Sequence, residues 1–239
     1  MTLQQRKANA PPGSYTKRLF EDSTLLRNKL VEEAQGRAQG GCGDHTGGNL
    51  EIKQATGCTI VGPRADAARI PGIDVEVGDG DSYTLGNAKA VVYDVPGHTR
   101  GHIAFWFEGS DALFCGDTLF AMGCGRLFEG TPAQMVNSLD KFKSLPPETR
   151  VFCAHEYTQA NGLFALSVEP DNADLVQRMQ DVDAARAKNI PTVPSTIGIE
   201  LATNPFLRAD SADLQKTIGM MGKDYVTVFA ETRQLKDNF

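Results

Sequence analysis

The sequence predicts an α+β protein in which a strand-rich core is followed by a helical region. Before residue 157, short runs rich in β-branched and aromatic residues are bounded by Gly, Pro or Asp, as β-strands commonly are. Beyond residue 157, apolar residues recur at helical spacing. A chain of 239 residues is long enough for one sizeable core and a small appended domain. We therefore expect a divergent or disordered segment over residues 1–43, a core over 44–156 and helices over 157–239.

The expected strands are apolar runs that end at turn-forming residues. They cover residues 59–61, 73–76, 90–95, 102–107, 112–115 and 151–154. No strand is predicted before residue 55. A short helix is expected from Ser23, a residue suited to an N-cap, to about Val31, because Leu26 and Leu30 share a helical face.

One helix is expected inside the core. Thr131 and Pro132 match an N-cap followed by proline at the first helical position, and this helix would run to about Phe142. The helices expected after the core cover residues 158–167, 172–188, 211–219 and 226–239. Residues 198–207, which include an Asn-Pro pair, are predicted to be a connecting loop.

The composition of the chain limits the kinds of partner it could bind and the cellular compartment in which it would fold. A net charge of −6 without a basic stripe argues against nucleic acid as a partner, and no apolar run approaches the ~20 residues that a membrane span needs. Five cysteines without a C-x-x-C pair indicate a reducing compartment. The first twenty residues are basic and contain no acid, which suits either an unstructured tail of a cytoplasmic protein or a mitochondrial transit peptide. A monomer is expected.

The four histidines lie in short polar segments beside predicted strands. They are His45 in GDHTGGN, His98 and His102 in PGHTRGH, and His155 in AHEYT, with Asp117 in CGDTLF between them. Strand ends can hold imidazoles and carboxylates around a cation, and Zn²⁺ accepts this mixture, as Fe and Mn also do. A single histidine is more often a structural or surface residue, so the residues alone leave both a metal site and structural histidines open.

Seven separated segments resemble, in order, those of the glyoxalase II family, the hydroxyacylglutathione hydrolases of the metallo-β-lactamase superfamily. They are GDHTGGN, PGHTRGH, GDTLF, GCGRLFEGTPAQM, AHEYT, NPFLR and RQLKDNF. The resemblance covers about residues 44–239. It implies an αββα sandwich with a site for two zinc ions, followed by a small helical domain that binds the glutathione part of a thioester. The implied reaction is hydrolysis of S-D-lactoylglutathione to D-lactate and glutathione, a step in methylglyoxal detoxification.

The resemblance also assigns roles to individual residues. The matched metal ligands are Asp44, His45, His98, Asp117 and His155. Asp117 would bridge two cations, with His98 on the first and the other three ligands on the second. His102 matches a supporting histidine rather than a ligand. The implied nucleophile is a metal-activated water rather than a side chain.

Four further residues match positions that contact glutathione, namely Arg126, Tyr157, Arg233 and Lys236. Cationic side chains there would pair with the two carboxylates of glutathione. Without the resemblance, composition alone favours a solvated helix face for Arg233 and Lys236. Phe128 stands where the family commonly has a tyrosine, which removes one hydroxyl group.

The chain departs from the family in its first metal loop. The family pattern T-H-x-H-x-D-H aligns with QGGCGDH, so that Gly40 and Cys42 replace two ligand histidines. The N-terminal strands of the fold are missing or divergent in residues 1–38. The first cation would keep His98 and Asp117, with Cys42 either a substitute thiolate ligand or a bystander.

Three interpretations therefore stay open. The first is a hydroxyacylglutathione hydrolase that binds two metals or a single one. The second is a catalytically impaired or inactive relative that binds glutathione and at most one metal. The third is a chain whose residues 1–43 are not the genuine start of the protein.

Overall fold

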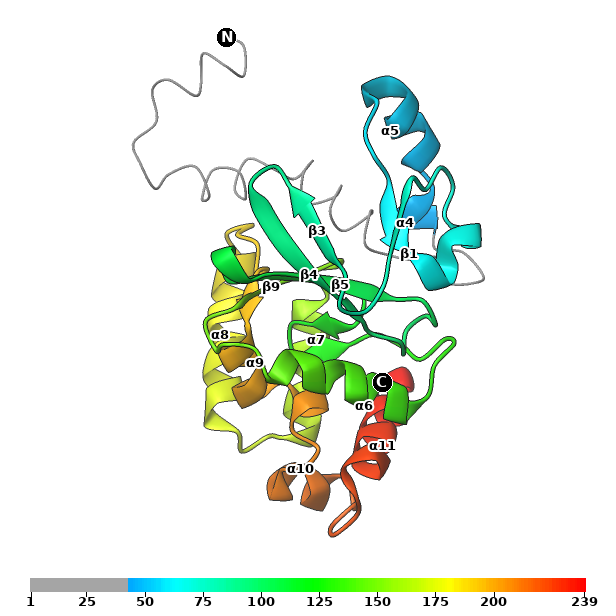
Figure 1. The fold of residues 1–239 in the computed structure, drawn as a ribbon. Coiled ribbons are helices and arrows are strands. Elements are labelled where there is room, and N and C mark those ends of the chain that lie inside the picture. Colours follow the sequence, from blue (N-terminus) through cyan, green and yellow to red (C-terminus); the bar gives the residue numbers. More distant parts are fainter. Residues whose placement is uncertain (1–42) are drawn as a thin grey trace.

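The computed structural model describes residues 43–239, and its core is a six-stranded mixed sheet (Figure 1). The strand order is β10-β9-β6-β5-β4-β3. The strands are β3 (Ser82–Leu85), β4 (Ala88–Asp94), β5 (Ile103–Phe107), β6 (Ala112–Gly116), β9 (Arg150–Cys153) and β10 (Ser195–Thr196). β6 and β9 are parallel, and the other neighbours are antiparallel. The strands predicted at 90–95, 102–107, 112–115 and 151–154 are thus confirmed.

Successive side chains of a strand point to opposite faces of the sheet. Here the side chains on both faces are buried, because other elements cover each face. On one face Phe105 and Phe114 pack with a parallel strand pair, β1 (Val61–Pro63) and β2 (Val75–Val77). On the other face Leu113 packs against helices that follow in the sequence. The near-continuous apolar character of β5 and β6 follows from burial on both sides.

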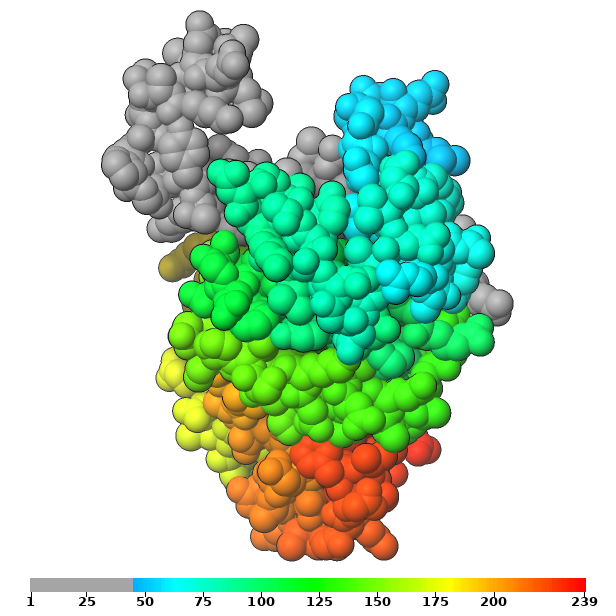
Figure 2. Space-filling view, viewed as in Figure 1, coloured from blue at the N-terminus to red at the C-terminus, as the bar shows by residue number. Residues whose placement is uncertain are grey.

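The helices form the remaining layers of the molecule. They are α4 (Gly43–Thr46), α5 (Asn49–Thr56), α6 (Pro132–Lys143), α7 (Thr158–Val168), α8 (Ala173–Arg186), α9 (Ile197–Thr203), α10 (Ala212–Thr217) and α11 (Tyr225–Asp237). Short 3₁₀ helices are η1 (Arg64–Arg69), η2 (Glu108–Ser110) and η3 (Pro205–Leu207). Figure 2 shows α10 and α11, in orange and red, at the end of the molecule opposite the blue and cyan residues that follow α4. No helix between residues 43 and 239 is long and apolar enough to cross a membrane.

The helix predicted from Thr131 and Pro132 is confirmed as α6. The Thr131 side chain accepts from the backbone N–H of Gln134, whose own side chain accepts from the backbone N–H of Thr131, a complete capping box. The helices predicted after the core correspond to α7, α8, α10 and α11. The helix predicted from Ser23 lies outside the described residues.

Three expectations about local structure were wrong or incomplete. Residues 198–207 are not a loop, because α9 and η3 occupy most of them, and the Thr196 side chain caps α9 at the N–H of Ile199. Two predicted strands, 59–61 and 73–76, form β1 and β2 but lie about two residues further along the chain. Helix α5 and the hairpin of β7 (Leu119–Phe120) and β8 (Gly123–Cys124) were not predicted.

Candidate active site

Three connections of the sheet bring polar side chains to one edge. β4 and β6 run in the same direction, because both pair antiparallel with β5, and β9 is parallel to β6. The C-terminal ends of these strands therefore lie at the same edge, where His98 follows β4, Asp117 follows β6 and His155 follows β9. Gly116 has a φ of 54°, which a glycine adopts readily and which turns the chain from β6 into Asp117. His45 reaches the same place from α4.

Donor atoms of three side chains converge at separations suited to a divalent cation. His45 Nε2 lies 2.9 Å from Asp117 Oδ2 and 3.3 Å from His155 Nε2, and His155 Nε2 lies 3.4 Å from Asp117 Oδ1. Ligand atoms about 2.05 Å from a tetrahedral Zn²⁺ are about 3.3 Å from one another. The three donors therefore fit a cation between them, and they form a group that could hold a metal ion.

The fourth candidate ligand, His98, lies near the same carboxylate, at the oxygen that also meets His45. Its Nε2 atom is 3.7 Å from Asp117 Oδ2. Its Nδ1 atom is 2.9 Å from the backbone carbonyl oxygen of Arg126. A carbonyl only accepts, so Nδ1 carries a proton, and Nε2 is the nitrogen available to a cation beside Asp117. A second hydrogen bond of this kind typically fixes the tautomer of a ligand histidine.

The charge state of the site suits cation binding. Burial acts to raise the pKa of Asp117, but the hydrogen bond with His45 and the neighbouring histidines outweigh it and hold the pKa at about 2. Burial lowers the pKa of His102 to about 4, so that this imidazole is neutral. Nε2 of His102 accepts from the backbone N–H of Asp117 at 3.0 Å. This contact matches the supporting role expected of His102, since the nitrogen is already occupied.

A cavity of about 480 Å³ opens beside this group of side chains. Its lining comprises His45, His98, Asp117, Phe120, Cys124, Arg126, Phe128, His155, Tyr157, Ala160, Asn161, Arg233, Lys236, Asp237 and Phe239. All four residues predicted to contact glutathione thus line one cavity together with four of the five predicted metal ligands. The side chain of Asp44, the fifth ligand, is not among those described, and Gly40 and Cys42 lie outside the described residues.

The cationic side of the cavity is organised around one carboxylate. Asp237 Oδ1 lies 2.9 Å from Arg233 Nη2 and 3.5 Å from Arg126 Nε. Arg233 is only 5% exposed, and its Nη1 donates to the backbone carbonyl of Cys124 at 3.0 Å. The guanidinium group of Arg126 is exposed, and Lys236 Nζ donates to the carbonyl of Ala160 at 3.1 Å. Arg126 and Lys236 are therefore better placed to meet an anionic ligand than Arg233.

Aromatic side chains form the walls next to the histidines. The Tyr157 ring stacks on His155 at a centroid distance of 5.0 Å, and the Phe128 ring centroid lies 5.0 Å from that of His98. Both rings are about half exposed, so they form the rim of the cavity. Among the thiols, Cys124 lines the cavity, but burial raises its pKa to about 11 and keeps it protonated. A cysteine nucleophile is therefore not indicated at Cys124.

Sequence reasoning did not single out several of the cavity residues. These are Phe120, Cys124, Ala160, Asn161, Asp237 and Phe239. All but Ala160 and Asn161 lie within segments that resemble the family, so membership of those segments was the available indication. The position of Asn161 depends on how α7 packs, and no motif marks it.

Two protein-family models together match the whole described chain. Residues 43–155 match the family model of the metallo-β-lactamase superfamily, and residues 156–239 match that of the hydroxyacylglutathione hydrolase C-terminus. The chain is 59% identical over 197 residues to the hydroxyacylglutathione hydrolase of Methylococcus capsulatus, which covers 82% of this chain and 77% of the relative. The chain belongs to the hydroxyacylglutathione hydrolase family.

Further members of the hydroxyacylglutathione hydrolase family show the same extent of match. The enzyme of that name from Rhodospirillum rubrum is 59% identical over 196 residues, again 82% of this chain and 77% of the relative. Among solved structures, ETHE1 from Myxococcus xanthus superposes with a TM-score of 0.51 and 19% identity, covering 90% of this chain and 81% of that one. This structural likeness supports the fold alone.

Family membership confirms two predictions made from the sequence. The resemblance to hydroxyacylglutathione hydrolases is confirmed, and so is an α+β fold of the metallo-β-lactamase type with a helical C-terminal part. Divalent metal binding is typical of this superfamily, and the converging donors of His45, Asp117 and His155 agree with it. Neither match includes residues 1–42.

Proposed function

We propose that this chain is a metal-dependent thioester hydrolase that converts S-D-lactoylglutathione to D-lactate and glutathione. The observation that carries the proposal is the position of the donor group of His45, Asp117 and His155 in the same cavity as Arg126 and Lys236. A cation site activates water for hydrolysis, and cationic side chains attract the carboxylates of a glutathione moiety. Relatives that are 59% identical carry the name hydroxyacylglutathione hydrolase, which supports the same activity here.

Zinc is the cation that the donor set favours, since it accepts imidazole together with carboxylate at these separations. We assign the position between His45, Asp117 and His155 to one cation, with Asp44 as a further ligand. His98, which lies outside this group of three donors, would belong to a second position beside Asp117. Among the described residues that second position has fewer donors, and we therefore expect it to bind its cation more weakly.

A cation bound in this group would act as a Lewis acid and provide activated water near neutral pH. The protein side chains orient the substrate for that attack. Arg126 and Lys236 would hold the glutathione carboxylates, while the rings of Tyr157 and Phe128 limit access of bulk water beside the histidines. The bond that breaks is the one between the acyl carbon and the glutathione sulfur, and glutathione leaves as a thiolate.

The second interpretation, an inactive relative that binds glutathione, is not favoured. The names of the 59% identical relatives support a hydrolase. The described donor group also supplies three ligands for one cation without any contribution from Gly40 or Cys42. A monomer that acts on a small glutathione thioester remains the proposed form of the enzyme.

The test is hydrolysis of S-D-lactoylglutathione by the purified chain supplied with zinc. We expect turnover that is lost on chelation and returns when zinc is added back. S-D-lactoyl-N-acetylcysteamine, which lacks the glutathione carboxylates, is the matched control and should be a much poorer substrate. A folded, zinc-loaded chain that hydrolyses no glutathione thioester would overturn the proposal.

A further inference from the structure

The hairpin formed by β7 and β8 is held by side chains from the C-terminal helices. Each residue from Phe120 to Cys124 has a backbone group bonded to such a side chain. Asn204 Nδ2 donates to the carbonyls of Phe120 at 3.1 Å and Gly123 at 3.0 Å. Asn161 Nδ2 donates to the carbonyl of Ala121 at 3.1 Å, and Arg233 Nη1 donates to that of Cys124 at 3.0 Å. The N–H of Met122 donates to Glu200 Oε2 at 2.8 Å. Two residue pairs join β7 to β8, so the side-chain bonds from outside add substantially to the contacts that hold the hairpin.

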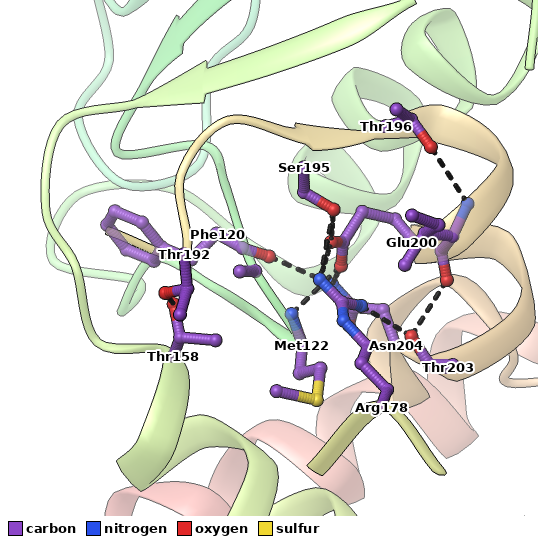
Figure 3. A network of polar contacts seen from close by, with 12 residues as sticks. Phe120, Met122, Thr158, Arg178, Thr192, Ser195, Thr196, Glu200, Thr203 and Asn204 are labelled. Carbon is purple, nitrogen blue, oxygen red and sulfur yellow. Dashed lines mark hydrogen bonds and ion pairs between the residues drawn. The ribbon is translucent and has the colours of Figure 1, made fainter. Parts of the chain in front are cut away.

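Glu200 is the centre of this arrangement (Figure 3). Its side chain is fully buried, and its two oxygens serve different partners. Oε2 accepts from the N–H of Met122 and, at 3.0 Å, from Asn204 Nδ2, whereas Oε1 accepts from Arg178 and from the hydroxyl of Ser195. The ion pair with Arg178 keeps the buried carboxylate paired with a positive charge. One oxygen thus faces the hairpin and the other faces the helical region.

The conformation of the hairpin needs such support. Met122 has a φ of 55°, in the left-handed region that residues other than glycine avoid. Its side chain is fully buried. A residue in such a conformation persists where its surroundings determine it, and here the bond from its N–H to Glu200 is part of those surroundings.

The hairpin matters to the cavity because of its place in the chain. It follows Asp117 and precedes Arg126, and Phe120 and Cys124 are part of the cavity lining. Asp117 itself is held separately, by the end of β6 and by His102 Nε2. Movement of the hairpin would therefore displace the wall of the cavity and Arg126 more than the cation position between His45, Asp117 and His155.

We propose that Glu200 and Asn204 are positioning residues, which hold the β7–β8 hairpin so that Phe120, Cys124 and Arg126 form the wall that binds the glutathione thioester. This role rests on the proposed function and deepens it. Neither residue lines the cavity, so both act through the hairpin backbone. Loss of the positioning contacts should weaken substrate binding and leave the cation site filled.

The test compares two substitutions in the same network. Asn204→Ala removes the amide group that donates to two hairpin carbonyls and to Glu200 Oε2. Ser195→Ala removes a bond to Glu200 Oε1 and leaves the hairpin contacts in place. We expect both variants to unfold at a lower temperature than the wild type. Only Asn204→Ala should raise KM for S-D-lactoylglutathione, by about tenfold, with kcat changed less than about twofold. Zinc content should equal that of the wild type in both variants.

Hydrogen exchange of the peptide covering residues 118–125 provides a readout that does not depend on turnover. We expect faster exchange in Asn204→Ala and a rate like that of the wild type in Ser195→Ala. If Asn204→Ala does not fold, Asn204→Ser retains an oxygen to cap the N–H of Phe206 and makes the same comparison. Equal exchange rates in the Asn204 and Ser195 variants, or an unchanged KM in the Asn204 variant, would overturn the proposal. If the wild type itself hydrolyses no glutathione thioester, the proposed function fails, and the exchange rates still decide the positioning role.

Discussion

His98 and Arg126 are joined by a hydrogen bond in which Nδ1 of the histidine donates to the backbone carbonyl of the arginine at 2.9 Å. The bond connects the two parts of the cavity. His98 faces the carboxylate of Asp117, whereas the side chain of Arg126 lies on the cationic side beside Asp237. Gly125 lies between the hairpin and Arg126. Because it has no side chain, the backbone here can lie close to Asp117 and His98.

Gly125→Ala should disrupt the site. A Cβ atom at this position would lie 2.0 Å from the carbonyl oxygen of Asp117 and 3.1 Å from His98 Nδ1, so the backbone must move. We expect a loss of about 2 kcal/mol or more in the free energy of unfolding and a sharp fall in kcat/KM. Gly109→Ala, at a position where a Cβ meets nothing within 4 Å, is the matched control. Similar activity and stability in the two variants would contradict the described packing.

Lys236→Ala should raise KM for a glutathione thioester about tenfold while kcat changes little, as expected when a side chain binds substrate and transition state equally. Steady-state kinetics with S-D-lactoylglutathione measure this directly. Lys223→Ala, which removes an exposed lysine that does not line the cavity, should leave KM unchanged. An unchanged KM for the Lys236 variant would mean that this residue does not contact the substrate.

Glu129→Ala should loosen the loop that carries His98. Glu129 Oε2 accepts from the backbone N–H of Arg100 at 2.9 Å, and Oε1 lies 2.7 Å from Arg69 Nη2 of η1. Glu129 is partly buried, and losing its hydrogen bonds costs about 1 kcal/mol. Urea unfolding would report the loss of stability, and zinc titration a lower affinity. A zinc affinity equal to that of the wild type would show that this loop is held by other contacts.

Removal of metal should destabilise the protein, because a cation binds only the folded arrangement of His45, Asp117 and His155. We expect a chelator to lower the melting temperature by roughly 10 °C, and added zinc to restore it. Calorimetry measures both steps. The same melting temperature with and without chelator would argue that no tightly bound cation contributes to the fold.

The elements that could be predicted from the sequence are those with a continuous run of strand-forming residues or a clear helix cap. β4, β5, β6 and β9 are apolar, β-branched or aromatic runs, and α6 begins with a recognisable cap. The edge strand β3, with the polar sequence SYTL, and the two-residue strands β7, β8 and β10 have no such pattern. They depend on contacts with neighbouring segments, which local sequence does not specify.

The helix α9 illustrates the same limit. Gly198 and β-branched residues weaken the local preference for a helix, and the Asn-Pro pair that follows indicates a loop. The structure forms the helix nevertheless, since Glu200 at its centre joins Arg178 and the β7–β8 hairpin. Tertiary contacts here outweigh local propensity.

The candidate site was predictable to the extent that motifs marked it. The segments around His45, His98, Asp117 and His155 predicted donors at strand ends, and the structure brings these side chains together. The burial of Arg233 and its bond to the carbonyl of Cys124 were not predictable, because they depend on which face of α11 meets the hairpin. Asp237, which pairs with two arginines, stood in a recognised segment without an assigned role.

The measurement that tests the central claim most directly is the zinc content and S-D-lactoylglutathione hydrolysis of the wild type beside Asp117→Asn. Asp117 lies between all three candidate histidine ligands, so its loss should remove both properties at once. We predict about one zinc or more per chain with turnover in the wild type, and almost no zinc and no turnover in the variant. Asp140→Asn, on the exposed side of α6, should behave like the wild type. An Asp117→Asn protein that retains as much zinc as the wild type would contradict the account.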